Sequence, residues 1–304
     1  MKNVLGVCVS TLALMVAVGG AASPAPADPG LLLVAHGSPS PEWNRPVLDF
    51  GRRVAEEVEK SGRFKAVRTA MLEAAQPDIP TAVAELESAG CDRIVAVPLF
   101  VAPTGHTHFD VPAMLGIYSS PRTAAVLSQE GAKAARPRVP IVLTQTMSEG
   151  EVLRKYALDQ VRKLSKSPKD EAIVLLAHGD AEHQLLADRL MRQVATCCCG
   201  TAGIGYGDWA YIGVGQEYLT HGVAAIKTAL EHKKRVLVVG LYVSSNASRI
   251  HQRCVATMRQ RGSGTDLFAG SDVVMSDDAI VTQPEFLRWV LDAAHAALSG
   301  ATEK

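Results

Sequence analysis

The chain has 304 residues, of which 47% are hydrophobic and 20% are charged, with 31 Lys and Arg residues against 31 Asp and Glu residues. This composition is typical of a globular protein with one large domain or two of ordinary size. The zero net charge gives no general electrostatic reason to expect nucleic acid as a partner, because proteins that bind it carry a basic surplus or stripe.

The first 27 residues predict a secretory signal and a linker. Lys2 precedes an apolar run from Val4 to Val18, and small residues and a Pro/Ala-rich stretch follow. This is the order of a signal peptide, and the apolar run is short for a membrane span. Cleavage after Ala22 or Ala27 satisfies the small-residue rule; an uncleaved anchor or a misassigned start codon are the alternatives. We therefore expect an exported, periplasmic protein with no stable membrane insertion.

From Leu31 onward, short apolar runs alternate with amphipathic stretches, which predicts β-α-β units and a mainly parallel sheet. In the first half the expected strands are Leu31–Val34, Ala66–Leu72, Ile94–Val101 and Ile141–Thr144, and the expected helices are Pro46–Lys60 and Ile79–Ala89. In the second half the expected strands are Ile173–Ala177, Trp209–Val214, Val236–Val243 and Val273–Met275, and the expected helices are Glu182–Ala195, Glu217–His232, Ala247–Arg261 and Pro284–Leu298.

The two halves match at a constant offset of 142 residues. The run from Val34 to Ser38 (VAHGS) recurs as Leu176 to Asp180 (LAHGD), and Pro98 to Val101 (PLFV) recurs as Gly240 to Val243 (GLYV). Two matching segments with the same offset indicate a tandem duplication of one α/β unit. We expect a signal and linker over 1–27, a first lobe over 28–166 that carries the active site, and a degenerate second lobe over 167–304.

Three polar side chains follow successive strands of the first half. His36 follows the first strand, Glu73 the second and His106 the third. The carboxyl ends of parallel strands share one edge of a sheet, so these residues are expected to converge. Two imidazoles and a carboxylate suit Co²⁺, Ni²⁺, Fe²⁺ or Zn²⁺, and they suit proton abstraction equally well.

The alternatives to a site are local roles. A histidine before glycine at a strand end can serve only to bond the backbone, and Glu73 can be a solvated or capping carboxylate. His108 fits a supporting or surface position better than a ligand. In the second half, His36 is matched by His178, whereas His106 and Glu73 are matched by Ser248 and Gly215. We therefore expect the working site in the first half and a mainly structural role for His178.

The five cysteines outside the signal have irregular spacing and form no disulfide framework. Thiolates bind soft metals, but the adjacent residues Cys197, Cys198 and Cys199 rarely converge on one ion. One disulfide with spare thiols is the favoured interpretation over a metal site.

Three ordered motifs carry a resemblance to a known family. They are LLLVAHGS (31–38), MLEAAQPDIPTAV (71–83) and VPLFVAPTGHTHFDVP (97–112). With these motifs the chain resembles the class II tetrapyrrole chelatases of the CbiX/SirB type, which include sirohydrochlorin cobaltochelatases, ferrochelatases and nickel-inserting relatives. The resemblance implies two flavodoxin-like α/β lobes, each with a four-stranded mainly parallel sheet flanked by helices, and a tetrapyrrole cleft between them.

The resemblance also implies roles for individual residues. His36 and His106 would bind the divalent metal, which is a substrate, and His36 would accept pyrrole N–H protons with help from Glu73. Substrate-binding positions would be Gln76, where the family commonly has an acidic residue, and the loop of Val101, Ala102, Pro103, Thr104 and Gly105. No organic cofactor is implied.

Two functions remain open at this point. The first is a sirohydrochlorin cobaltochelatase-like enzyme that inserts Co²⁺, with Fe²⁺ and Ni²⁺ as alternatives, in cobalamin- or sirohaem-type biosynthesis. The second is an exported metal- or tetrapyrrole-binding carrier without turnover. A hydrolase fits poorly, because no G-x-S-x-G motif is present and Ser38 has no evident acid–base partners.

Overall fold

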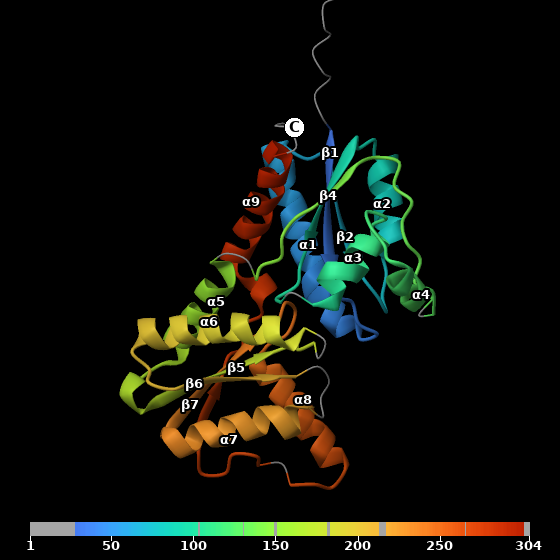
Figure 1. Ribbon diagram of the computed structural model, residues 1–304. Helices are drawn as coiled ribbons and strands as arrows, with labels where there is room; N and C mark the ends of the chain where they lie inside the picture. Colours follow the sequence, from blue (N-terminus) through green and yellow to red (C-terminus); the bar gives the residue numbers. More distant parts are fainter. Residues whose placement is uncertain are drawn as a thin grey trace, which may run out of the picture.

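The computed structural model describes residues 28–102, 104–129, 131–148, 151–180, 183–212, 217–264 and 266–300. The predicted signal and linker over 1–27 lie outside these residues. The chain forms two lobes, each built on its own sheet (Figure 1). No helix of the described part is both long enough and apolar enough to cross a membrane.

The first sheet is parallel and has the order β2-β1-β3-β4. Its strands are β1 Pro29–Ala35, β2 Ala66–Met71, β3 Arg93–Pro98 and β4 Ile141–Leu143. Every residue of β1 is buried, as expected for a central strand covered by helices on both faces.

The second sheet repeats this topology with the order β6-β5-β7-β8, again parallel. Its strands are β5 Glu171–Ala177, β6 Gly207–Tyr211, β7 Arg235–Leu241 and β8 Asp272–Met275. The register repeats as well, because Leu33 pairs with Val97 and Leu175 pairs with Val239. The predicted α/β class and the two four-stranded sheets are confirmed, and the shared register agrees with a duplication.

Helices cover both sheets. Those of the first half are α1 Pro41–Ser61, α2 Ile79–Ser88, α3 Val111–Met114, α4 Pro121–Gln129 and α5 Val152–Leu164. Those of the second half are α6 Gln184–Ala202, α7 Val223–His232, α8 Ala247–Gln260 and α9 Pro284–Gly300. Side chains cap several of them: Asp78 accepts the Thr81 N–H at 2.9 Å at the start of α2, Ser120 accepts the Thr123 N–H at 3.1 Å at the start of α4, and Asn246 accepts the Arg249 N–H at 2.8 Å at the start of α8.

The last helix of each half packs on the lobe of the other half. Helix α9 lies beside α1 and β3, and its Phe286 ring lies 4.9 Å from that of Phe50 (Figure 1). Helix α5 lies against α6 and β7, and its Tyr156 hydroxyl donates to the Asp278 carbonyl at 2.8 Å. The two closing helices are therefore exchanged between the lobes, and the expected division at residue 166 stays a prediction.

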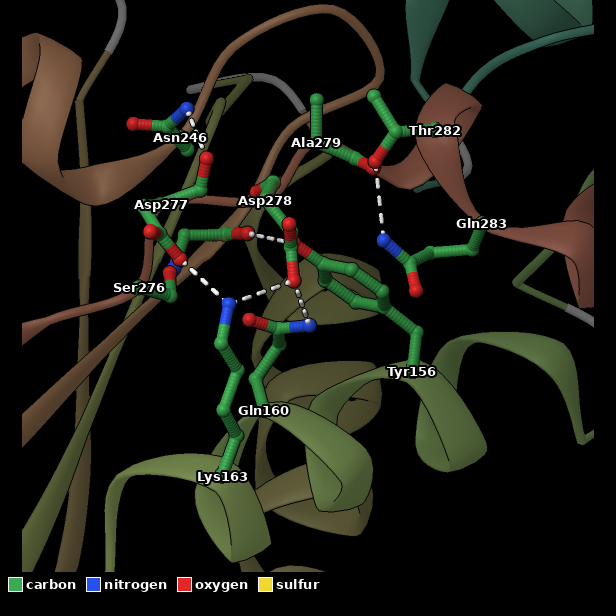
Figure 2. Close-up of polar contacts among 11 residues, drawn as sticks. Tyr156, Gln160, Lys163, Asn246, Ser276, Asp277, Asp278, Ala279, Thr282 and Gln283 are labelled. Carbon is green, nitrogen blue, oxygen red and sulfur yellow. Dashed lines mark hydrogen bonds and ion pairs between the residues drawn. The ribbon is translucent and has the colours of Figure 1, made fainter.

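Polar contacts fix the exchanged helix α5 (Figure 2). Lys163 donates to Asp277 at 2.8 Å and to Asp278 at 3.2 Å, and Gln160 donates to Asp278 at 3.0 Å. One hydrophobic core runs through both lobes as a result, and it includes Phe50 of α1, Val161 of α5 and Phe286 of α9.

All five described cysteines are free thiols. The expected disulfide is absent from the described residues, and Cys197, Cys198 and Cys199 lie within α6, where successive side chains point in different directions. Burial raises the pKa of Cys198 to about 12 and also raises the pKa of Cys199. The thiols of Cys198 and Cys199 therefore stay protonated at neutral pH and are weak nucleophiles.

Candidate active site

A cleft of about 450 Å³ lies between the lobes at the carboxyl ends of the strands. Residues that follow β1, β3, β5 and β7 line it, so both copies of the duplicated unit contribute. The volume falls within the range of small-molecule sites, and parallel sheets commonly bind ligands at this edge.

His36 is held in a tight turn after β1. Gly37 has a φ of 86°, and a Cβ at this position would lie 2.0 Å from the Glu73 carbonyl oxygen. This close approach, which requires glycine, lets the Glu73 N–H donate to the His36 carbonyl at 3.1 Å. The Nδ1 atom of His36 lies 3.0 Å from the Gly37 carbonyl oxygen and 3.5 Å from the Glu73 carboxylate. The structure thus brings His36 and Glu73 together.

His106 begins a π-helical turn, His106–Asp110, that follows β3. Its ring centroid lies 4.9 Å from that of His36, with an interplanar angle of 79°. Its Nδ1 atom lies 2.7 Å from the Asp110 carboxylate, and the ring of Phe100 packs 6.3 Å away. A carboxylate partner of this kind fixes both the tautomer and the orientation of a histidine.

His178 also lies in the cleft, with its ring centroid 5.7 Å from that of His36. Its Nδ1 atom lies 2.9 Å from the Gly179 carbonyl oxygen, which repeats the geometry of His36 and Gly37. Desolvation by the cleft walls lowers the pKa of His178, and the nearby His36 lowers it further. His178 thus lines the same cleft as the first-half residues, and the expectation of a mainly structural role stays a prediction.

The second-half positions that correspond to His106 and Glu73 carry Ser248 and Gly215, so the two halves differ there. Ser248 lies in α8, outside the residues that line the cleft, and Gly215 lies outside the described residues. The first half alone thus supplies a second histidine in the described part of the cleft.

The hydrogen bonds define which nitrogen of each histidine is free. A carbonyl oxygen or a carboxylate can only accept, so the Nδ1 atoms of His36, His106 and His178 carry the protons. The Nε2 atoms keep their lone pairs for a metal ion or a proton. The described residues hold no group of three or more His, Cys, Asp or Glu side chains arranged to enclose a metal ion.

The expected substrate loop is placed in part at the cleft. Val101, Ala102 and Thr104 line it, Gly105 lies beside it against the second lobe, and Pro103 is outside the described residues. Gln76 is exposed and away from the cleft lining, and its side chain accepts the Asp78 N–H at 3.0 Å. The expected role of Gln76 at the substrate is not supported by this position, because the residue belongs to the turn before α2.

Several cleft residues escaped the sequence interpretation. Trp43 and Arg253 line the cleft from α1 and α8, and Arg253 lies 5.2 Å from the Trp43 ring centroid. Tyr242, the equivalent of Phe100, has a buried hydroxyl with no hydrogen-bond partner among the described residues, as does Thr104. The duplication offset was a signal for Tyr242, whereas nothing in the sequence pairs Trp43 with Arg253.

The chain is similar in sequence to known proteins. The family model described as CbiX matches residues 30–164. A sirohydrochlorin cobaltochelatase of Methanopyrus kandleri is 39% identical over 87 residues, which are 29% of this chain and 58% of that protein, little more than half its length. A sirohydrochlorin cobaltochelatase of Saccharolobus solfataricus is 37% identical over 101 residues, which are 33% of this chain and 74% of that protein.

The fold matches a solved structure over nearly the whole chain. The structure described as SirB from Bacillus subtilis with Fe³⁺ has a TM-score of 0.63 at 15% identity and covers 91% of this chain and 98% of that one. The sequence motifs, the two parallel sheets and the sequence similarity all agree with one class of protein. The chain belongs to the CbiX/SirB family of class II sirohydrochlorin chelatases.

Proposed function

We propose that this protein is a chelatase that inserts a divalent metal, Co²⁺ in the first place and Fe²⁺ or Ni²⁺ as alternatives, into a sirohydrochlorin-like tetrapyrrole. Such a step belongs to cobalamin- or sirohaem-type biosynthesis. The observation that carries the proposal is the pair of histidines His36 and His106, whose rings lie 4.9 Å apart at the cleft and whose Nδ1 atoms are both tied to acceptors. Two free Nε2 atoms can hold a borderline divalent ion without enclosing it.

Insertion requires the ion to lose water ligands while the macrocycle loses two N–H protons. His36 and His106 replace part of the hydration shell, and the open positions of the ion then pass to the pyrrole nitrogens. His36 accepts one of the two protons as the ion leaves its Nε2 atom, and His106, released from the ion in the same way, accepts the other. Glu73, 3.5 Å from the other ring nitrogen of His36, stabilises the His36 imidazolium that results. No nucleophile or redox group is needed for this exchange.

The cleft walls suit a flat macrocycle with polar edges. Phe100, Leu241 and Val243 supply apolar surface on the two sides, and the hydroxyls of Thr104 and Tyr242, two residues of the cleft lining, have no hydrogen-bond partner among the described residues. A buried hydroxyl without a partner is costly, so a ligand that pairs with it gains affinity. The guanidinium of Arg253 supplies positive charge at the cleft for carboxylates of the substrate.

Anaerobic incubation of the protein with sirohydrochlorin and Co²⁺, followed by absorbance, tests the proposal. We expect insertion well above the uncatalysed rate with catalytic amounts of protein. An equimolar spectral change that stops after one equivalent, or tight binding at the uncatalysed rate, would favour the carrier without turnover and contradict the enzyme.

We further propose export to the periplasm, on the basis of the apolar segment and the small residues at Ala22 and Ala27. Cell fractionation followed by N-terminal sequencing tests this. A mature chain that begins at residue 23 or 28 in the periplasmic fraction is expected, and an unprocessed chain in the cytoplasm would contradict it.

A further inference from the structure

The second lobe makes a direct contact with the loop that carries His106. The carboxylate of Asp180, which follows the turn after β5, accepts the backbone N–H of Gly105 at 2.8 Å. Gly105 immediately precedes His106, and 75 residues separate the two partners in the chain. A contact from one lobe thus reaches the backbone next to a proposed metal ligand of the other.

The carboxylate itself is held in place. The same oxygen of Asp180 lies 3.1 Å from the Nδ1 atom of His183, and the His183 N–H donates to the Asp180 carbonyl at 3.2 Å. Only 23% of the Asp180 side chain and 17% of the His183 side chain are exposed. Partial burial strengthens a charge-assisted hydrogen bond, because less water competes for it.

The Gly105 backbone lies close to these side chains. A Cβ at Gly105 would lie 3.5 Å from the Asp180 carboxylate and 3.8 Å from the His183 ring, which is ordinary van der Waals contact. The ring of His183 also lies 6.0 Å from that of Phe109, in the same π-helical turn as His106. Gly105 and Phe109, both in the segment after β3, therefore lie close to the second lobe.

The two repeats differ at the position of this contact. Asp180 is the equivalent of Ser38, whose hydroxyl makes only a short-range contact in the described part, accepting the Ser40 N–H at 3.1 Å. The carboxylate of Asp180 is longer than the Ser38 hydroxyl and reaches the His106 loop of the first lobe. The first half carries the histidine at position 106, and the second half carries the group that holds its loop.

We propose that Asp180 is a positioning residue that fixes the His106 loop from the opposite lobe, so that the metal site is fully formed only when the two lobes are in contact. This inference rests on the proposed function for its catalytic consequence. Asp110 orients the His106 ring at 2.7 Å, and Asp180 fixes the backbone that carries it. A histidine whose ring and backbone are both fixed loses little conformational freedom when it binds a metal ion.

Three variants test the proposal: Asp180→Ala, Asp180→Asn and the control Asp278→Ala. Asn keeps an oxygen that can accept the Gly105 N–H, whereas Ala removes it. Asp278 is a carboxylate that joins α5 to the second lobe (Figure 2), so its loss should lower the thermal midpoint without affecting the cleft.

Hydrogen exchange of the Gly105 amide, measured by NMR, reports on the contact without any turnover. We expect faster exchange in Asp180→Ala and near-normal exchange in Asp180→Asn and Asp278→Ala. In the insertion assay, kcat of Asp180→Ala should fall about 10- to 100-fold while KM changes much less, with Asp180→Asn restoring most of the activity. Unchanged Gly105 exchange in Asp180→Ala, or faster exchange with an unchanged kcat, would overturn the proposal.

A failure of the proposed function would be distinguishable. If the wild-type protein inserts no metal, the affinity of the protein for Co²⁺ alone, measured by titration calorimetry, still tests the positioning. Weaker binding in Asp180→Ala than in Asp180→Asn is expected, and equal affinities would overturn it.

Discussion

The imidazole of His178 lies 5.7 Å from that of His36, ring centroid to ring centroid, although the two residues follow equivalent strands of separate sheets. Both residues donate from Nδ1 to the carbonyl of the following glycine. The duplication thus places two histidines with the same Nδ1 contact in one cleft, and the first half adds His106 as a third.

Replacement of His178 should affect catalysis as well as stability. Because desolvation lowers the pKa of His178, its imidazole stays neutral and able to accept a proton below the ordinary pKa of histidine. We expect His178→Ala to reduce the rate of Co²⁺ insertion, by up to roughly 100-fold if it accepts a pyrrole proton. Steady-state kinetics at pH 7 check this, and an unchanged rate would return His178 to a purely structural role.

The turn at Gly37 should tolerate no side chain. Gly37→Ala places a Cβ against the Glu73 carbonyl in a backbone conformation with positive φ, which we expect to cost about 1 to 3 kcal/mol or more and to displace His36. Gly62→Ala is the matched control, because its φ is 65° and no atom lies within 4 Å of the added Cβ. Urea unfolding compares the two, and equal losses would show that only the backbone conformation matters.

The buried hydroxyl of Tyr242 should matter more to the ligand than to the fold. It has no partner in the described part of the chain, so Tyr242→Phe should leave the free energy of unfolding unchanged or raise it by about 1 kcal/mol, while KM for the tetrapyrrole rises. Tyr211 provides the contrast, because its hydroxyl donates to Asp188 at 2.9 Å and Tyr211→Phe should destabilise by about 1 kcal/mol. A KM unaffected by Tyr242→Phe would exclude a contact with substrate.

Two histidines outside the cleft should make the fold sensitive to mild acid. Desolvation lowers the pKa of His251 and of His295 below 6.5 in the folded chain. The unfolded chain therefore takes up more protons as the pH falls through 6.5, and the free energy of unfolding decreases. We expect the double variant His251→Gln, His295→Gln to lose less stability than the wild type between pH 7 and pH 5. Parallel losses measured by denaturant titration would argue against this origin.

Much of the fold was predictable because buried parallel strands are apolar runs that end at turns, as Leu31 to Val34 shows. The exchange of α5 and α9 was not, since an amphipathic helix does not specify which of two similar sheets it covers. The expected helix Glu182–Ala195 in fact extends to Ala202, because the cysteine run continues it.

For the site, histidines at strand ends were predictable because parallel strands bring their carboxyl ends together. The hydrogen bond from the Gly105 N–H to the Asp180 carboxylate was not predictable, since it depends on how the two lobes face each other.

The most direct test of the central claim compares His106→Ala with His108→Ala in the anaerobic Co²⁺ insertion assay. Both residues lie in the same π-helical turn, but His106 lines the cleft and is bonded to Asp110, whereas His108 is exposed and outside the lining. We expect His106→Ala to lose roughly 100-fold or more of the insertion rate and His108→Ala to stay within about threefold of the wild type. Equal rates in the two variants would contradict the assignment of the metal site to His36 and His106.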